Sequence, residues 1–294
     1  MTIKKILVAT DFSKEAEIAL NQSISIARHT GAAVTMVHAM GLSLSDDMDL
    51  SSAEVTNAYQ AQLKEIEKDA REKLEKIRLR HKGQGVDISH VFIDTMPDKG
   101  VLTAASESET DLIVVGSHDR GRVAAFFLGS VSKKIAHLAK CDVLVARGLA
   151  PQGGYKRILV PTDFSEHSEL AIARAIELVE PGGEIEIVHS WQLPGGPATY
   201  WGSFGEGLRA DIQKSADTKG VELLAKYATD KVSITFSTIE GSPRRTIERY
   251  IADQDFGVVV MGTHGRGGIE KLVLGSVAES ILAHAKSSVY LVRK

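Results

Sequence analysis

Residues Val258–Ser280 read VVVMGTHGRGGIEKLVLGSVAES, an apolar run followed by a glycine-rich turn and a segment with helical spacing. The pattern predicts a strand, a flexible loop and a helix that opens at Gly275-Ser276. Glycine lets backbone N–H groups approach an anion closely, and the start of a helix favours negative charge. The stretch therefore indicates either a phosphate-binding loop or a glycine-rich turn without a ligand. It lacks the Gly-Lys-Ser/Thr ending of a Walker loop and the GxGxxG of a dinucleotide-binding turn.

The same pattern occurs twice in the chain. Lys4–Ser13 (KKILVATDFS) returns as Lys156–Ser165 (KRILVPTDFS), and Leu112–Ser117 (LIVVGS) returns as Val258–Thr263 (VVVMGT). Between the halves, Gly148–Tyr155 has the glycines and the proline of a short connector. The sequence therefore predicts two copies of one domain, at residues 1–150 and 151–294.

Within each half, apolar runs of strand length alternate with segments of helical spacing. In the second half we expect a helix over Glu166–Val179 and strands at Ile158–Pro161, Glu184–His189, Val232–Ile239, Val258–Met261 and Val289–Val292. This alternation predicts an α/β fold of two tandem Rossmann-like domains, each a five-stranded, mostly parallel sheet with helices on both faces. Ligands of such sheets bind beyond the carboxyl ends of the strands. Asp11 and Asp163 follow the first strands and the glycine loops follow the fourth, so we expect them to meet at that edge.

The composition of the chain argues against several classes of protein. The chain has 294 residues, of which 43% are apolar and 25% charged, and its net charge of -3 gives no electrostatic reason to bind nucleic acid. No stretch approaches the roughly 18 apolar residues that a membrane span requires. The one cysteine, Cys141, leaves no internal disulfide, which is typical of a reducing compartment. We therefore expect a cytoplasmic protein without a nucleic-acid or membrane partner.

With its motifs in this order, the chain resembles the universal stress protein A family in its tandem two-domain form. The resemblance covers nearly the whole chain and rests on these segments of the second half: Val160-Pro-Thr-Asp163, Val188-His189, Gly241-Ser-Pro243, Gly262-Thr-His-Gly265 and Gly275-Ser276. It implies binding of ATP, with or without Mg²⁺, and a role as a stress-response sensor or regulator.

The resemblance also implies which residues bind the nucleotide. Asp163 would contact the nucleoside, Val188 would meet the adenine through its backbone, and the glycines with Ser276 would hold the phosphates. The full set of candidate residues is Pro161, Thr162, Asp163, Val188, Gly262, His264, Gly265, Arg266, Gly275, Ser276 and Val277.

The first half departs from this pattern. Its loop reads Gly116-Ser-His-Asp119, with an aspartate where the second half has Gly265, and Ala9 stands in place of Pro161. A carboxylate about 4 Å from a phosphate costs roughly 1 kcal/mol per charge pair in water and ~4 kcal/mol at a partly buried surface. We therefore expect ATP mainly in the second half, and we expect a Gly265→Asp change to weaken its binding.

Several candidates have a second interpretation. Asp11 and Asp163 precede helices and also fit helix caps, and Ser130 and Ser276 fit N-caps as well as phosphate ligands. The remaining alternatives are loop or solvent-facing roles for His118, His264, Arg120 and Arg266, packing for Cys141, and either an ordered loop or a lid for the aromatic stretch Trp191–Gly207.

An enzyme is the alternative to a regulator. A slow ATPase or autokinase would use Ser276 or Thr263 near the γ-phosphate. The chain lacks the SGGxDS loop of adenylating enzymes, and it shows no clustered acidic metal ligands or catalytic loop of a fast phosphoryl-transfer enzyme.

The resemblance also implies how the domains associate. Single domains of that family dimerise through their last strands, so we expect Val143–Ala146 to pair with Val289–Val292 as an intramolecular pseudo-dimer. A homodimer of the whole chain is a further expectation.

Overall fold

Strands and helices alternate along the computed structural model, which describes residues 2–41, 53–117, 128–193, 202–263 and 274–293. The first half contains β1 (Lys5–Ala9), α1 (Lys14–Thr30), β2 (Ala33–Ala39), α2 (Ala53–Arg80), β3 (Ile88–Ile93), α3 (Pro97–Glu107), β4 (Leu112–Gly116), α4 (Ser130–Leu138) and β5 (Asp142–Ala146). The second half contains β6 (Tyr155–Thr162), α5 (Glu166–Leu178), β7 (Val179–Trp191), α6 (Gly202–Tyr227), β8 (Ser233–Glu240), α7 (Pro243–Ala252), β9 (Val258–Gly262), α8 (Ser276–His284) and β10 (Ser288–Val292).

The strands form one continuous sheet in the order β3-β2-β1-β4-β5-β10-β9-β6-β7-β8. Within each half all neighbouring strands are parallel. The halves join where β5 and β10 pair antiparallel, with Tyr290 opposite Leu144. The predicted α/β fold and the predicted pairing of the last strands are therefore confirmed, and the two five-stranded sheets merge into one of ten strands.

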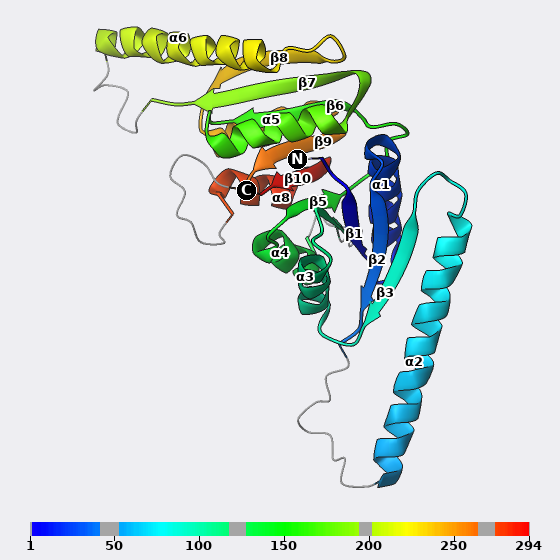
Figure 1. Ribbon diagram of the computed structural model, residues 1–294. Helices are drawn as coiled ribbons and strands as arrows, with labels where there is room; N and C mark the ends of the chain where they lie inside the picture. The colour runs from blue at the N-terminus through cyan, green and yellow to red at the C-terminus, as the bar shows by residue number, and fades with distance from the viewer. Residues whose placement is uncertain (1, 42–52, 118–127, 194–201, 264–273, 294) are drawn as a thin grey trace.

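Helices cover both faces of this sheet (Figure 1). The apolar core on one face includes buried side chains of α1, α2, α5 and α6, for example Leu20, Leu74, Ile172 and Leu223. The core on the other face includes buried side chains of α3, α4, α7 and α8, for example Val101, Ile135, Ile247 and Ile281. Parallel strands buried on both faces explain why their sequences are nearly continuous apolar runs.

Strand β7 starts earlier than predicted. The sequence predicts a helix to Val179 and a strand from Glu184, whereas the strand already begins at Val179, next to Tyr155 on β6. The pairing then shifts register before Arg157, where the chain passes through Gly182 at a φ of 78°. Gly183 allows a close approach, because a Cβ there would lie 2.9 Å from the Lys156 carbonyl oxygen. Gly182 and Gly183 therefore form an irregularity inside β7. They do not form a loop between α5 and the strand.

Across the junction, one arginine of each half caps the C-terminal end of a helix in the other half. Arg147 follows β5 and donates hydrogen bonds to the carbonyls of Ala285, at 2.9 Å, and Leu282, at the end of α8. Arg293 follows β10 and donates to the carbonyls of Ala136 and His137 in α4. A cation at a helix C-terminus satisfies its last carbonyls and complements its dipole. Each half therefore holds the last helix of the other.

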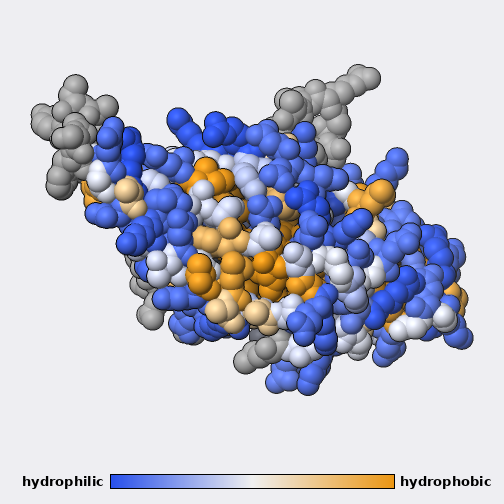
Figure 2. Space-filling model, turned by 90° about the horizontal axis from the view of Figure 1, so that it is seen from above, coloured by the Kyte–Doolittle hydropathy of each residue, from blue (hydrophilic) through white to orange (hydrophobic). Residues whose placement is uncertain are grey.

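One face of the molecule is largely polar at its margins (Figure 2). Figure 2 shows one face of the molecule on which hydrophilic residues surround an apolar area near the centre of the view. No helix in the part of the chain that the structure describes is both long and apolar enough to cross a membrane.

Candidate functional site

The strand order places a crevice between β6 and β9. The connections from β6 lead outward through β7 to β8, and the chain then returns to place β9 on the other side of β6. These two strands pair only at Ile158 with Val258 and at Leu159 with Val259. Beyond those residues they separate, and Pro161 has no N–H to donate there. Such a switch point at the carboxyl edge is where open α/β sheets bind ligands.

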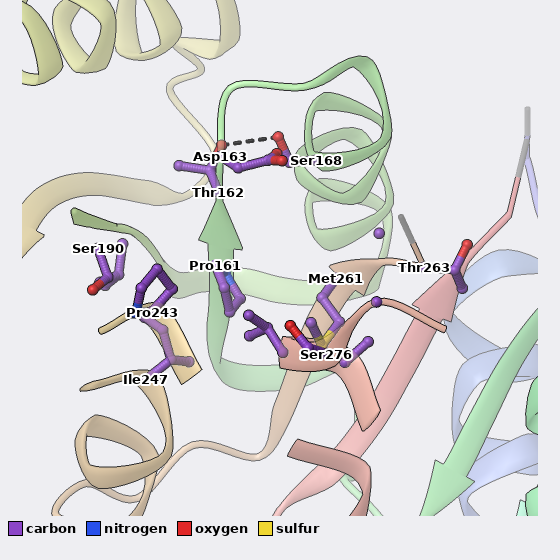
Figure 3. A pocket seen from close by; sticks show the side chains of 15 residues that line it. Pro161, Thr162, Asp163, Ser168, Ser190, Pro243, Ile247, Met261, Thr263 and Ser276 are labelled. Carbon is purple, nitrogen blue, oxygen red and sulfur yellow. Dashed lines mark hydrogen bonds between the residues drawn. The ribbon is translucent and has the colours of Figure 1, made fainter. Parts of the chain in front are cut away.

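A cavity of about 200 Å³ occupies this crevice. Figure 3 shows Pro161, Met261 and Ser276 close together, with Ser190, Pro243 and Ile247 along one side. The lining residues are Pro161, Thr162, Asp163, Ser168, Val188, Ser190, Pro243, Ile247, Met261, Gly262, Thr263, Gly275, Ser276, Val277 and Ala278. Eight of the eleven candidates from the sequence therefore line one cavity. The other three, His264, Gly265 and Arg266, lie outside the described residues.

Asp163 shapes the turn after β6 and does not cap the helix. Its Oδ1 accepts the N–H of Ser165 at 3.0 Å, and the Ser165 hydroxyl caps α5 by accepting the N–H of Ser168. Between them, Phe164 has a φ of 60°, a left-handed conformation that is unusual for a bulky residue. Its ring lies 4.4 Å from that of His189, whose Nδ1 lies 2.8 Å from the Thr162 carbonyl oxygen. The helix-cap interpretation of Asp163 is thus wrong, and the hydrogen bond from the Ser165 N–H holds its carboxylate in this turn, where Asp163 lines the cavity.

The start of α8 forms the opposite side of the cavity. Gly275 is the N-cap, and its N–H donates to the Thr263 carbonyl oxygen at 2.8 Å. The first bond inside the helix runs from the Glu279 N–H to the Gly275 carbonyl oxygen. The N–H groups of Ser276, Val277 and Ala278 precede that bond, as the first donors of any helix do. Ser276 is the first helical residue, so its N-cap interpretation is wrong, and so is that of Ser130, which follows the N-cap Gly129.

Gly262 serves the packing of β9 against α5. A Cβ at this position would lie 2.8 Å from the Cβ of His167. Gly116 has the same role in the first half, since a Cβ there would lie 2.6 Å from the Glu15 carbonyl oxygen. This close approach accounts for both glycines, and a phosphate contact at Gly262 stays a prediction.

Thr263 does not present its hydroxyl to the cavity in the way that the autokinase alternative requires. It is 1% exposed, and its Oγ1 donates to the Val292 carbonyl oxygen on β10 at 3.5 Å. Both residues line the cavity, but Ser276 is exposed and Thr263 is buried. Val188 is fully buried in β7, between Pro161 on β6 and Ser237 on β8. Its predicted backbone contact with a base stays a prediction.

The side wall of the cavity was missed from the sequence. Ser190 lies just beyond the predicted strand, and its hydroxyl donates to the carbonyl oxygen of Gly241 at 3.0 Å. Ile247, on α7, is 2% exposed. The motif Gly241-Ser-Pro243 was the available signal, because Pro243 opens α7 and itself lines the cavity.

The first half has a cavity of about 490 Å³ at the equivalent place, between the ends of β1 and β4. Its lining residues are Ala9, Thr10, Asp11, Ser13, Glu15, Ala16, Val37, Ala39, Pro97, Val101, Val115, Gly116, Leu128, Gly129, Ser130, Val131 and Ser132. The Asp11 Oδ1 accepts the N–H of Ser13 at 3.0 Å, as the Asp163 Oδ1 accepts that of Ser165. The Ser13 side chain in turn caps α1. The loop residues His118, Asp119 and Arg120 lie outside the described residues.

The titratable groups do not form a metal site in the described part of the chain. Over the described ranges, no three His, Cys, Asp or Glu side chains gather in a way that would hold a metal ion. Burial raises the pKa of the Cys141 thiol to about 11, with the nearby Asp142 charge adding to the shift. A thiol with this pKa is almost entirely protonated at neutral pH, which agrees with a packing role.

The universal stress protein family model matches this chain twice, over residues 2–147 and 154–293. This chain belongs to the universal stress protein family. Its two matches establish the tandem form, while the domain limits at 150 and 151 stay a prediction.

Individual relatives agree with this assignment. Universal stress protein Rv2005c of Mycobacterium tuberculosis is 30% identical over 200 residues, and the match spans 64% of this chain and 63% of that protein. Universal stress protein Rv2623 of the same organism is 26% identical over 300 residues, or 98% of this chain and 96% of that protein. The crystal structure of a universal stress protein from Archaeoglobus fulgidus superposes with a TM-score of 0.70 at 20% identity, covering 98% of both chains, and so shares the fold.

Proposed function

We propose that the second half of this universal stress protein binds one ATP and that the protein acts as a cytoplasmic stress-response sensor or regulator. The observation that carries the proposal is the cavity between β6 and β9, which has a carboxylate on one side and a helix start on the other. These are the two recognition elements that a nucleotide needs at its opposite ends.

In this proposal the nucleoside occupies the cavity. Val188 and Ile247 offer apolar surface to the base, and Asp163 accepts hydrogen bonds from the ribose hydroxyls. A volume of about 200 Å³ is below the usual range of roughly 300–1,000 Å³ for complete small-molecule sites. The phosphates would therefore lie at the mouth of the cavity.

The phosphates would meet the start of α8. The N–H groups of Ser276 and Val277 and the positive end of the helix dipole favour an anion there, and the Ser276 hydroxyl adds one donor. Bound Mg²⁺ would neutralise part of the phosphate charge. Slow hydrolysis or autophosphorylation is a second candidate function, favoured by the position of the Ser276 hydroxyl at the cavity.

A matched pair of substitutions tests the proposal. We expect Asp163→Asn to weaken ATP binding at least about tenfold, because hydrogen bonds to a charged group contribute roughly 1.5–3 kcal/mol. Asp11→Asn changes the equivalent residue of the first half and should leave ATP affinity unchanged. Isothermal titration calorimetry of the full chain measures both. Wild-type affinity in Asp163→Asn, or equal loss in the two variants, would contradict the assignment.

A further inference from the structure

The first-half cavity is built at the same sheet edge as the ATP site proposed above, but it is larger. Its volume of about 490 Å³ lies inside the range of small-molecule sites. Val37 of β2, Val101 of α3 and Val115 of β4 supply an apolar interior, and each is at most 2% exposed. Such walls suit the flat ring of an aromatic molecule.

The charges around this cavity differ from those of the second half. Both Asp11 and Glu15 are in its lining, and none of its lining residues within the described ranges is a lysine, arginine or histidine. The second-half lining has the one carboxylate of Asp163 over the same ranges, and its residue equivalent to Glu15 is His167. The first-half cavity therefore repels a polyphosphate more strongly.

A nearby lysine does not reverse this repulsion. Lys134 lies one turn along α4 from the cavity and contacts the Asp98 carboxylate at 3.0 Å. The hydrogen bond from Lys134 lowers the pKa of Asp98, so the carboxylate stays charged and neutralises the lysine. The second half has Arg244 in place of Asp98, and this arginine lies 3.8 Å from the Glu248 carboxylate.

We propose that the first-half cavity is a second ligand site, which takes an uncharged, nucleoside-sized aromatic molecule in preference to nucleotides. The Ser13 N–H donates to the Asp11 carboxylate, as the Ser165 N–H donates to that of Asp163 in the second half. Asp11 lines the cavity from this turn, so its carboxylate can accept hydrogen bonds from sugar hydroxyls. Glu15 provides a second acceptor for hydroxyl or amino groups. The choice of a nucleoside rests on the nucleotide proposed for the second half, because both halves have an aspartate in the same turn, Asp11 and Asp163.

Adenosine is the probe, and calorimetry of the full chain saturated with ATP is the measurement. We expect one further equivalent of adenosine per chain. Ala39→Leu places a larger side chain in the first-half cavity and should abolish this binding without changing ATP affinity. Ser190→Leu, its counterpart in the second half, should weaken ATP binding and leave one adenosine site.

Glu15→Gln supplies a test that preserves side-chain size. It should tighten the binding of AMP to the ATP-saturated chain by about fivefold, the effect of removing one like-charge contact at about 4 Å in water. The proposal is overturned if ATP-saturated protein takes up no adenosine, if Ala39→Leu binds adenosine normally, or if Glu15→Gln leaves AMP affinity unchanged. Adenosine uptake in a protein that binds no ATP would overturn the ATP assignment alone.

Discussion

Gly262 is a position where any side chain would collide with α5. An added Cβ would lie 2.8 Å from His167 Cβ and 3.0 Å from its carbonyl carbon, so Gly262→Ala must displace β9 or the helix start. Overpacking of this kind costs about 1–3 kcal/mol. Urea unfolding should show this loss, whereas Gly153→Ala is a control because a Cβ there meets nothing within 4 Å. Equal stability of both variants would show that the packing constraint is absent.

The sequence predicted which residues lie at the cavity better than it predicted what each of them does there. Asp163, Gly275 and Ser276 reach one cavity because each follows or opens an element whose period was visible in the sequence, whereas Val188 was a candidate through the family resemblance alone. The role of Asp163 in the turn was not visible, since an aspartate before a helix fits either a cap or a turn. Only the bond from the Ser165 N–H distinguishes the two.

At the scale of the element, the reciprocal caps make the last helix of each half depend on the other half. Arg147 is 4% exposed, and burial lowers its pKa to about 10. The guanidinium is retained there by carbonyl acceptors of α8. Because α8 begins at the proposed phosphate site, a residue of the first half supports an element of the second.

Removal of this cap is expected to destabilise the whole protein. Arg147→Met leaves the α8 carbonyls of Leu282 and Ala285 without the arginine donor, at a cost of about 2–4 kcal/mol. Arg293→Met is the matched variant, because it removes the equivalent donor from α4. Chemical denaturation measures both free energies of unfolding. The cap account fails if each variant unfolds at the wild-type midpoint with the wild-type slope.

The elements themselves were largely predictable, but their lateral contacts were not. The parallel strands appear as apolar runs because both faces are buried, and Ser13 and Ser165 are typical helix-start residues. The early start of β7 was not predicted, because it depends on the pairing of Val179 with Tyr155 and on the irregularity at Gly182, which are tertiary features. Ile247 was missed as a wall of the cavity because the packing of α7 is a tertiary property.

At the scale of the molecule, the two halves share one sheet, so neither presents β5 or β10 as an edge. Tyr290 of β10 is fully buried, and its hydroxyl donates to Asp142 of β5 at 2.9 Å. Separation would expose an apolar strand edge and the polar groups of this contact.

Residues 151–294 expressed alone should therefore self-associate through β10 or precipitate. Light scattering after size-exclusion chromatography measures the mass of the soluble fraction. The full chain, in which β5 covers β10, is the control. A soluble, stable monomer of the isolated half would mean that the shared sheet is not required for its folding.

The number of ATP molecules bound per chain tests the central claim most directly. The two cavities lie at equivalent places in the sheet but differ in the charge of their lining residues, so we expect ATP in the second half alone. Calorimetric titration of nucleotide-free full chain with ATP should give one equivalent per chain, with an affinity at least about tenfold weaker in Asp163→Asn and unchanged in Asp11→Asn. Two equivalents, none, or one that depends on Asp11 would contradict the account.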